Sequence, residues 1–227
     1  MSFWIIVIET YNESSLHKAL KDYFTPKDAK QEVLLKGSVC DILCENTKIY
    51  EIQTANISRL RTKLEKFLPE YKIEVVYPII ENNFIRMLNS DTSERSYRKS
   101  PKHGEFFQIF REITGIYYLI GHKNLTLNLL YIDAETIKID DGLGRSRRKR
   151  PRIIDKKLIK INRSQKIKNI EELIMPVKVR LRPSFLMKDV RVSCSKKYAN
   201  YIVWFLRKLE IIKLTEKRGN AHVYEFC

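Results

Sequence analysis

Residues 36–54 read KGSVCDILCENTKIYEIQT, and this stretch sets the architecture that we expect for the chain. It holds two runs of strand-forming residues, 38–44 and 49–53. A Lys-Gly turn at 36–37 precedes the first run, and a polar turn at 45–47 separates the two. The runs therefore predict neighbouring antiparallel strands.

Further elements are expected on both sides of these strands. Residues 32–35 add a third strand and complete an antiparallel β-meander. Asn12 is the predicted cap of a helix over residues 13–24, and Asn56 of a helix that ends near residue 68. Residues 73–79 are rich in Val and Ile, as in a strand covered on both faces. The order helix, three strands, helix, strand predicts an α/β (α+β) fold.

The middle of the chain changes in composition. Residues 90–104 are polar and basic, and we expect a linker or mobile loop there. A helix is predicted over residues 105–119, and strands over 126–132, 136–139 and 153–161.

The last part has the order of a winged helix-turn-helix. A short helical turn at 171–174, closed by Pro176, precedes a short helix at 184–190 and a longer one from Ser195 to about residue 209. A hairpin of strands 211–215 and 222–226 follows. In that motif the longer helix enters the major groove of DNA. We predict three parts, namely residues 1–90, 91–165 and 166–227.

The charge of the chain is uneven. Its 227 residues contain 43 Lys and Arg against 27 Asp and Glu, a net charge of +16. Residues 1–90 hold 12 basic and 12 acidic side chains, so the remaining 31 and 15 fall in residues 91–227. A basic part joined to a neutral one favours binding of a polyanion over mere solubility.

Two basic segments are the predicted DNA contacts, and a solvated charged surface is the alternative in both places. The first is a charged run before residue 153. The second is the long C-terminal helix with its hairpin turn. The predicted residues are Arg145, Arg147, Arg148, Lys149, Arg150, Arg152, Lys196, Lys197, Asn200, Arg207, Lys217 and Arg218.

Several classes of protein are excluded at this point. The longest apolar run is at residues 3–8, too short to span a bilayer, and no signal peptide is recognised. No Walker sequence indicates a nucleotide site. The four cysteines match neither zinc spacing nor a disulfide framework, so reduced thiols are expected. We expect a cytoplasmic protein that makes no membrane contact.

Chemistry is predicted at the carboxylates of the first part. If the strands at 38–44 and 49–53 pair, Asp41 comes close to Glu51, and Gln53 shares the face of Glu51. Hard oxygen ligands of this kind hold Mg²⁺ in phosphodiester hydrolysis. The alternative is that Glu51 and Gln53 form the solvent face of a half-buried strand.

These residues resemble the PD-(D/E)xK superfamily, also called restriction-endonuclease-like. The resemblance covers residues 1–80 and lies in Glu13 on the first helix, Asp41 after Gly37-x-x-x, and Glu51-Ile52-Gln53. It implies a mixed sheet flanked by helices, with Asp41 and Glu51 as metal ligands. Gln53 would then orient the nucleophile, and Glu13 would complete the site. Gln53 stands where the superfamily usually has lysine, and Cys40 where it has proline.

Short motifs also resemble those of an uncharacterised family of prokaryotic proteins of similar length. They include Leu16-His17-x-x-Leu20 and Gly121-His122-x-Asn124. This likeness would cover nearly the whole chain, and it implies one architecture of nuclease-like part plus winged helix.

The leading hypothesis is a metal-dependent DNA endonuclease that uses Mg²⁺ or Mn²⁺ and docks on double-stranded DNA through its basic part. His17 shares a helix face with Glu13 and is either an accessory residue or a surface histidine. The rival hypothesis is a catalytically inactive DNA-binding regulator that retains the nuclease-like fold. RNA as substrate and a homodimer stay open as alternatives.

Overall fold

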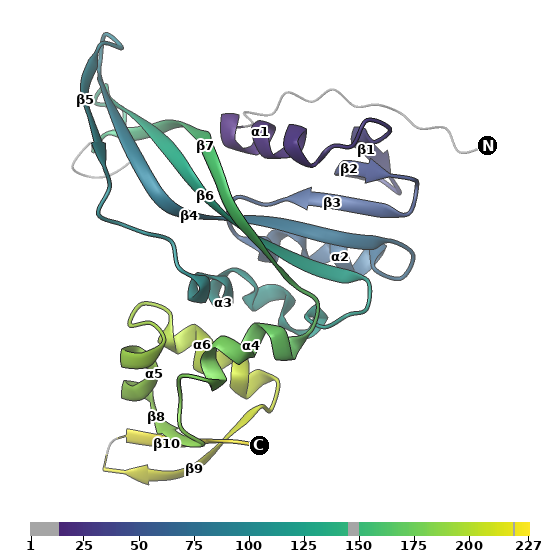
Figure 1. Cartoon of the computed structure of the whole chain (residues 1–227), viewed down its shortest axis with the longest axis vertical. Coiled ribbons are helices and arrows are strands. Elements are labelled where there is room, and N and C mark those ends of the chain that lie inside the picture. The colour runs from purple at the N-terminus through teal and green to yellow at the C-terminus, as the bar shows by residue number, and fades with distance from the viewer. Residues whose placement is uncertain (1–13, 145–149, 220) are drawn as a thin grey trace. The chain divides into compact units, whose positions relative to one another are not determined.

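The structure is a computed structural model that describes residues 14–144, 150–219 and 221–227 (Figure 1). It is mixed α+β, with a mixed sheet flanked by helices, as the sequence predicts at this level. Contacts divide the chain into two compact units. The sheet unit comprises the described residues up to Thr54 together with Glu70–Glu105 and Leu127–Lys166. The helical unit comprises Ala55–Pro69, Phe106–Thr126 and Ile167–Cys227.

The sheet unit contains one helix and seven strands among the described residues. They are α1 (Ser15–Phe24), β1 (Lys30–Leu35), β2 (Ser38–Cys44), β3 (Lys48–Ile52), β4 (Lys72–Asn89), β5 (Glu94–Lys99), β6 (Leu125–Asp140) and β7 (Arg152–Ile167). The strand order is β1-β2-β3-β4-β6-β7, and β5 pairs with β4. Strands β1 to β3 form the predicted antiparallel meander, and β4 runs parallel to β3.

Helix α1 lies across one face of this sheet (Figure 1). Its Leu16 and Leu20 are buried against Ile52 of β3, Val76 of β4 and Leu130 of β6. Period-two alternation places Ile52, Val76 and Leu130 on the same sheet face, and burial of these side chains stabilises the layer. This packing fixes α1 against the sheet and so sets the position of the residues on the side of α1 that faces it.

The start of α1 differs from the prediction. Ser14 is the cap, and its hydroxyl accepts a hydrogen bond from the backbone N–H of His17 at 3.3 Å. The helix begins at Ser15, not at residue 13. The predicted cap Asn12 and the candidate residue Glu13 lie outside the described residues.

The strands after residue 72 are longer than predicted. Strand β4 continues ten residues past Ile79, and its outer half pairs with β5, from Phe84 opposite Lys99 to Leu88 opposite Glu94. The prediction of a loop over residues 90–104 was therefore wrong for Glu94–Lys99. Its Ser, Arg and Lys composition is typical of loops, but the ladder to β4 satisfies its backbone. The two strands predicted at 126–132 and 136–139 are one strand, β6.

The helical unit is built from short helices and a three-stranded sheet. Its elements are η1 (Ile57–Leu60), α2 (Arg61–Phe67), η2 (Phe106–Gln108), α3 (Ile109–Glu112), η3 (Thr114–Leu119), α4 (Ile170–Lys178), β8 (Ser184–Leu186), α5 (Met187–Ser193), α6 (Ala199–Lys208), β9 (Ile212–Arg218) and β10 (Ala221–Phe226). The sheet order is β8-β10-β9, and both pairings are antiparallel.

Five helix predictions in this unit need correction. The helix predicted at 184–190 is a short strand, β8, followed by α5, and the long helix begins at Ala199 and not at Ser195. Asn56 has φ 54° and makes no side-chain cap, because the chain turns through the left-handed region there. The helix predicted over 105–119 is broken into η2, α3 and η3. Its Gly115 packs so closely on Ser58 that a Cβ would lie 2.7 Å from the Ser58 Cβ. Pro176 lies inside α4 instead of ending it.

None of the helices formed by the described residues combines the length and the apolar character that a bilayer crossing requires.

Candidate functional site

The candidate site lies where β2 and β3 separate. Their pairing ends at Ile42 opposite Tyr50, and the same register would place Asp41 opposite Glu51. The Asp41 carboxylate occupies the gap instead, and its Oδ2 accepts the backbone N–H of Ile52 at 2.7 Å. A side chain thus replaces a backbone acceptor at the point where the ladder opens.

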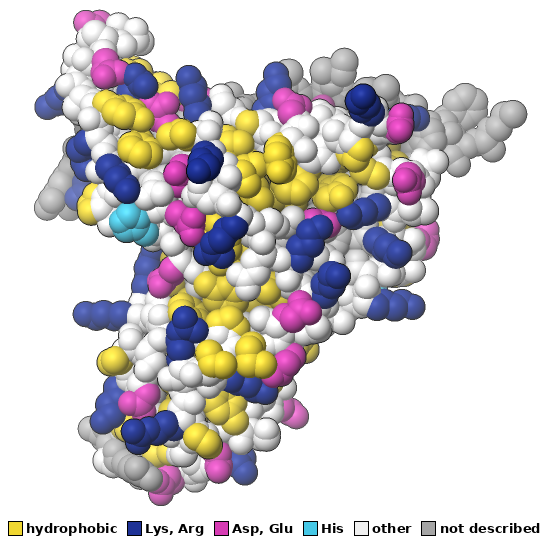
Figure 2. All heavy atoms as spheres, viewed as in Figure 1, with side chains coloured by type: hydrophobic (Ala, Val, Ile, Leu, Met, Phe, Trp, Pro, Cys, Tyr) yellow, Lys and Arg dark blue, Asp and Glu magenta, His cyan; other side chains and the backbone are white. Residues whose placement is uncertain are grey.

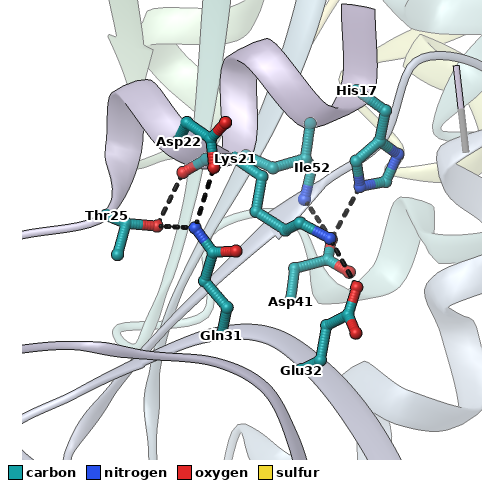
Figure 3. A network of polar contacts seen from close by, with 8 residues as sticks. All are labelled: His17, Lys21, Asp22, Thr25, Gln31, Glu32, Asp41 and Ile52. Carbon is teal, nitrogen blue, oxygen red and sulfur yellow. Dashed lines mark hydrogen bonds and ion pairs between the residues drawn. The ribbon is translucent and has the colours of Figure 1, made fainter. Parts of the chain in front are cut away.

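His17 approaches the same carboxylate from α1. Its Nε2 lies 3.6 Å from Asp41 Oδ2, and the two side chains are 25% and 21% exposed, so water reaches both (Figure 3). The contact becomes an ion pair only when the imidazole is protonated. Because α1 is capped at Ser14 and anchored by Leu16, the backbone of His17 is fixed over the sheet.

Glu51 and Gln53 are at the end of β3. The Glu51 side chain is 2% exposed, although β3 ends one residue later. By alternation Glu51 lies on the sheet face opposite Tyr50 and Ile52, which pack toward α1. The backbone N–H of Gln53 donates to Val76 O at 2.9 Å, so Gln53 stays bound to β4. The alternative, in which Glu51 belongs to the solvent face of its strand, does not hold, because the Glu51 side chain is buried.

The donors near the end of β3 suit a hard divalent cation by their chemistry. Asp41, Glu51 and Gln53 offer two carboxylates and a carboxamide oxygen, which are the ligand types that Mg²⁺ and Mn²⁺ take. Within the described residues, however, no three His, Cys, Asp or Glu side chains are gathered closely enough to form a metal site. Asp41 and Glu51 are the residues that would hold such an ion.

Lys21 is a residue of this region that the sequence did not single out. It lies four residues after His17 on α1, is only 4% exposed, and donates to Glu32 Oε1 of β1 at 2.7 Å (Figure 3). The signal available in the sequence was the i, i+4 spacing from His17. Lys21 places a positive charge on the helix face that also carries His17.

A second buried carboxylate belongs to Glu74 of β4, on the sheet face that α1 covers. Lys48 Nζ and Lys166 Nζ lie 3.1 and 3.0 Å from its oxygens, and Asn128 Nδ2 donates at 2.8 Å. Burial raises the pKa of the Glu74 carboxyl, but the hydrogen bonds from Asn128, Lys166 and Lys48 outweigh it, so the pKa lies below its ordinary value. This acid, within a run predicted to be apolar, was also missed.

The predicted basic run is described only in part. Arg145, Arg147, Arg148 and Lys149 lie outside the described residues. Arg150 is exposed. The Arg152 guanidinium forms two contacts to Asp141 Oδ2, at 2.8 and 2.7 Å, across the β6–β7 turn. Arg152 therefore has an acidic partner within the chain.

The predicted C-terminal contacts are separated along α6 and the hairpin. Lys196 and Lys197 are exposed in the turn before α6, and Asn200 is exposed in its first turn. Arg207 is exposed near the end of α6, and Lys217 is exposed on β9. The side chain of Arg218 lies outside the described residues.

The apolar side of α6 is covered within the same unit. Phe205 packs edge-on against Phe110 of α3 at 5.3 Å, and Trp204 packs against Tyr117 of η3 at 5.4 Å, between ring centroids. Phe205 is a buried core residue, as predicted, whereas Trp204 is half-buried. The N-terminal end of α6, with its exposed polar residues, is therefore the part of this region that a ligand can reach.

Comparison with protein families matches residues 14–168 to the family described as Domain of unknown function (DUF8091). The chain belongs to the DUF8091 family. An uncharacterised protein of Treponema pallidum (strain Nichols) is 43% identical over 219 residues, which cover 96% of this chain and 87% of that protein. No solved structure matches the chain.

The DUF8091 match begins at the cap of α1 and ends one residue after β7. It therefore contains Asp41, Glu51 and Gln53, together with Glu74 and its lysine partners. Helices α4 to α6 and strands β8 to β10 follow the DUF8091 region. The similarity to the Treponema protein extends over that part as well, because it covers nearly all of the chain.

Proposed function

We propose that this DUF8091 protein is a metal-dependent DNA endonuclease that hydrolyses phosphodiester bonds. The observation that carries the proposal is Asp41, which lies where β2 and β3 separate and whose carboxylate accepts the backbone N–H of Ile52, the residue after Glu51. The element order α1, β1, β2, β3, α2, β4, with β4 parallel to β3, agrees with the PD-(D/E)xK arrangement that the motifs resemble.

The proposed roles follow from the chemistry of the side chains. Asp41 and Glu51 would hold Mg²⁺ or Mn²⁺, and such an ion would supply activation of a water and stabilisation of charge on the phosphate. The Gln53 carboxamide orients that water by hydrogen bonding. Hydrolysis then forms a bond from the water oxygen to phosphorus and breaks the bond to the leaving sugar oxygen, which takes up a proton. His17 positions the Asp41 carboxylate.

The C-terminal part supports docking on duplex DNA. The order α4, β8, α5, α6, β9, β10 with sheet order β8-β10-β9 supports the proposal of a winged helix-turn-helix. Lys196 and Lys197 in the turn before α6, and Asn200 in its first turn, have the cationic and amide groups that contact phosphates and base edges. A cationic surface of this kind would capture DNA that the carboxylates alone would repel.

Cleavage of supercoiled plasmid tests the proposal. Purified protein is incubated with Mg²⁺, Mn²⁺ or EDTA, beside Asp41→Ala, Glu51→Ala and the control Glu45→Gln, which removes a carboxylate at the exposed turn of the same hairpin. We expect nicking or linearisation that needs metal, is lost in both alanine variants and is kept in the control. Cutting that survives Asp41→Ala and Glu51→Ala would refute the assigned ligands.

A catalytically inactive DNA-binding regulator is the second candidate. The feature that favours it is Gln53, because a carboxamide cannot offset phosphate charge as a lysine does. In that case wild-type protein cuts no plasmid under any metal, salt-sensitive duplex binding persists, and Glu51→Ala leaves binding unchanged or tightens it.

A further inference from the structure

The two ends of the seven-stranded sheet carry different charge. Strand β7 closes one end with sixteen residues, of which six are basic and one is acidic. Strand β1 closes the other end with six residues, one Lys and one Glu. Basic side chains are thus concentrated on the β7 edge of the sheet. On the face of the molecule drawn in Figure 2, Lys and Arg side chains lie among acidic and apolar ones.

Half of the basic residues of β7 are paired within the sheet unit. Arg152 contacts Asp141, Arg163 contacts Glu81 at 3.1 Å, and Lys166 contacts Glu74. These pairs join β7 to β6 and β4, and they account for part of its charge by a structural role. They leave Lys156, Lys157 and Lys160 to be explained.

Lys156, Lys157 and Lys160 form no salt bridge with any carboxylate in the described parts of the chain. Lys157 and Lys160 are exposed, and Lys156 is half-buried. The acid next to them in sequence, Asp155, is occupied by the N-terminus of α1, because its Oδ1 accepts the Ser15 N–H at 3.0 Å. Lys157 and Lys160 lie near enough to Asp155 and Asp133 to act on them electrostatically, but none of the three ammonium groups is in salt-bridge contact with a carboxylate in the described residues. They can therefore also contact an external polyanion.

We propose that β7 is a docking strip for the phosphate backbone of duplex DNA, contacted by Lys156, Lys157 and Lys160. The proposal rests on the proposed function only in taking DNA as the ligand, and it needs no cleavage. At about 3.3 Å per residue, the stretch from Lys156 to Lys160 is about 13 Å long, so these contacts would fall within one turn of B-DNA, which is roughly 34 Å. Sugar-phosphate contacts along this stretch would position the duplex without reading its sequence.

Protection of the sheet edge is the competing explanation for the same lysines. Proteins place lysines on edge strands to prevent pairing with another sheet. The apolar Ile153, Ile154 and Ile159 of β7 are 53%, 42% and 49% exposed, so such protection would have a purpose here. Pairing of two β7 strands would also bring like charges together, which disfavours a second copy as the occupant.

Equilibrium binding in EDTA separates these explanations without any cleavage. A labelled duplex of about 30 base pairs, roughly three turns, is titrated with wild-type protein and with the triple variant K156Q/K157Q/K160Q across a salt series. The matched control is K27Q/K30Q/K72Q, which removes three exposed lysines elsewhere in the sheet unit. Circular dichroism and thermal unfolding check that both variants are folded, and sedimentation gives their oligomeric state.

We expect the β7 variant to bind about tenfold or more weakly near 0.1 M salt, and its slope of log K against log salt to fall by about 2.7, or about 0.9 per lost contact. The control should change neither quantity appreciably. An equal loss of DNA affinity in the β7 variant and the control would overturn the proposal. So would a β7 variant that binds DNA as tightly as wild type but self-associates, because its lysines would then protect the sheet edge. Lysine-dependent binding to vesicles of anionic lipid, without binding to DNA, would also overturn it. Binding that depends on β7 in a protein that cuts no DNA would refute the endonuclease alone.

Discussion

Asp41 and Glu74 are carboxylates of one sheet, and the chain holds them in opposite ways. Glu74 is 3% exposed and lies within about a hydrogen-bond length of two lysine ammonium groups. Asp41 is partly exposed and meets a backbone N–H and an imidazole, whose charge depends on pH. Permanent neutralisation is suited to stability, whereas a hydrated carboxylate at an opening in the ladder is suited to binding.

Because of this difference, we expect mutations of the two acids to affect different measurements. Removing the charge of Glu74 leaves two lysines facing a neutral group inside the sheet, which costs free energy of folding. Removing the charge of Asp41 leaves an oxygen that still accepts the Ile52 N–H. We therefore expect stability to follow Glu74 and activity to follow Asp41.

The largest expected effect is that of Asp41→Asn on cleavage. An amide keeps the shape and the acceptor for Ile52 but is a poor ligand for a divalent cation, so activity should fall by about 10² to 10³ or more. Its free energy of unfolding in urea should stay within about 1 kcal/mol of wild type. If Asp41→Asn lowers the free energy of unfolding by more than about 1 kcal/mol, Asp41 is a structural residue like Glu74.

The next effect is that of Glu74→Gln on stability. We expect a loss of about 2 kcal/mol, less than for a fully buried pair because Lys48 and Lys166 are 35% and 48% exposed. Urea unfolding at neutral pH measures it, with Glu70→Gln as a control for an exposed acid of the same unit. A loss as small as that of the control would mean that the lysines are satisfied by water.

The pH dependence of this loss sharpens the comparison. The pKa of Glu74 in the folded chain lies below its ordinary value, so its stabilisation is complete above the ordinary glutamate pKa of about 4.3 and is lost as the pH falls through the lower folded value. The stability advantage of wild type over Glu74→Gln should therefore shrink from about pH 5 downward. Unfolding curves at pH 7, 5 and about 3 test this, and a difference independent of pH would contradict it.

The smallest expected effect is that of Ser14→Ala. Loss of the cap to the His17 N–H should cost about 1 kcal/mol of stability and fray the turn that holds His17 over Asp41. Thermal unfolding measures the cost, and Ser14→Asp, which keeps a capping oxygen, should restore it.

The meander could be predicted from the sequence because its signals are local. Gly37 and the polar turn at 45–47 delimit β2 and β3, and the register through Ile42 and Tyr50 follows from a short hairpin. The same locality made the approach of Asp41 to β3 predictable. Burial of Glu51 was not, because alternation gives the face of a residue and not what covers that face.

The errors occurred where distant contacts override local composition. Polar residues at 133 and 135 split β6 into two predicted strands, yet Asp133 is bonded by Asn82 and Asn162, and Glu135 by Arg86. A loop was predicted for Glu94–Lys99 for the same reason, since pairing with β4 is invisible in the sequence.

The partners of Glu74 also bear on how the chain is made. Lys48 precedes Glu74 by 26 residues in the chain, but Lys166 follows it by 92, so the ribosome adds that ammonium group last. Until then Lys48 is the one lysine partner of Glu74 already synthesised, strand β7 is incomplete, and water must solvate the rest of the carboxylate. The meander can fold early through local contacts, but the sheet can close only after β7 has been synthesised.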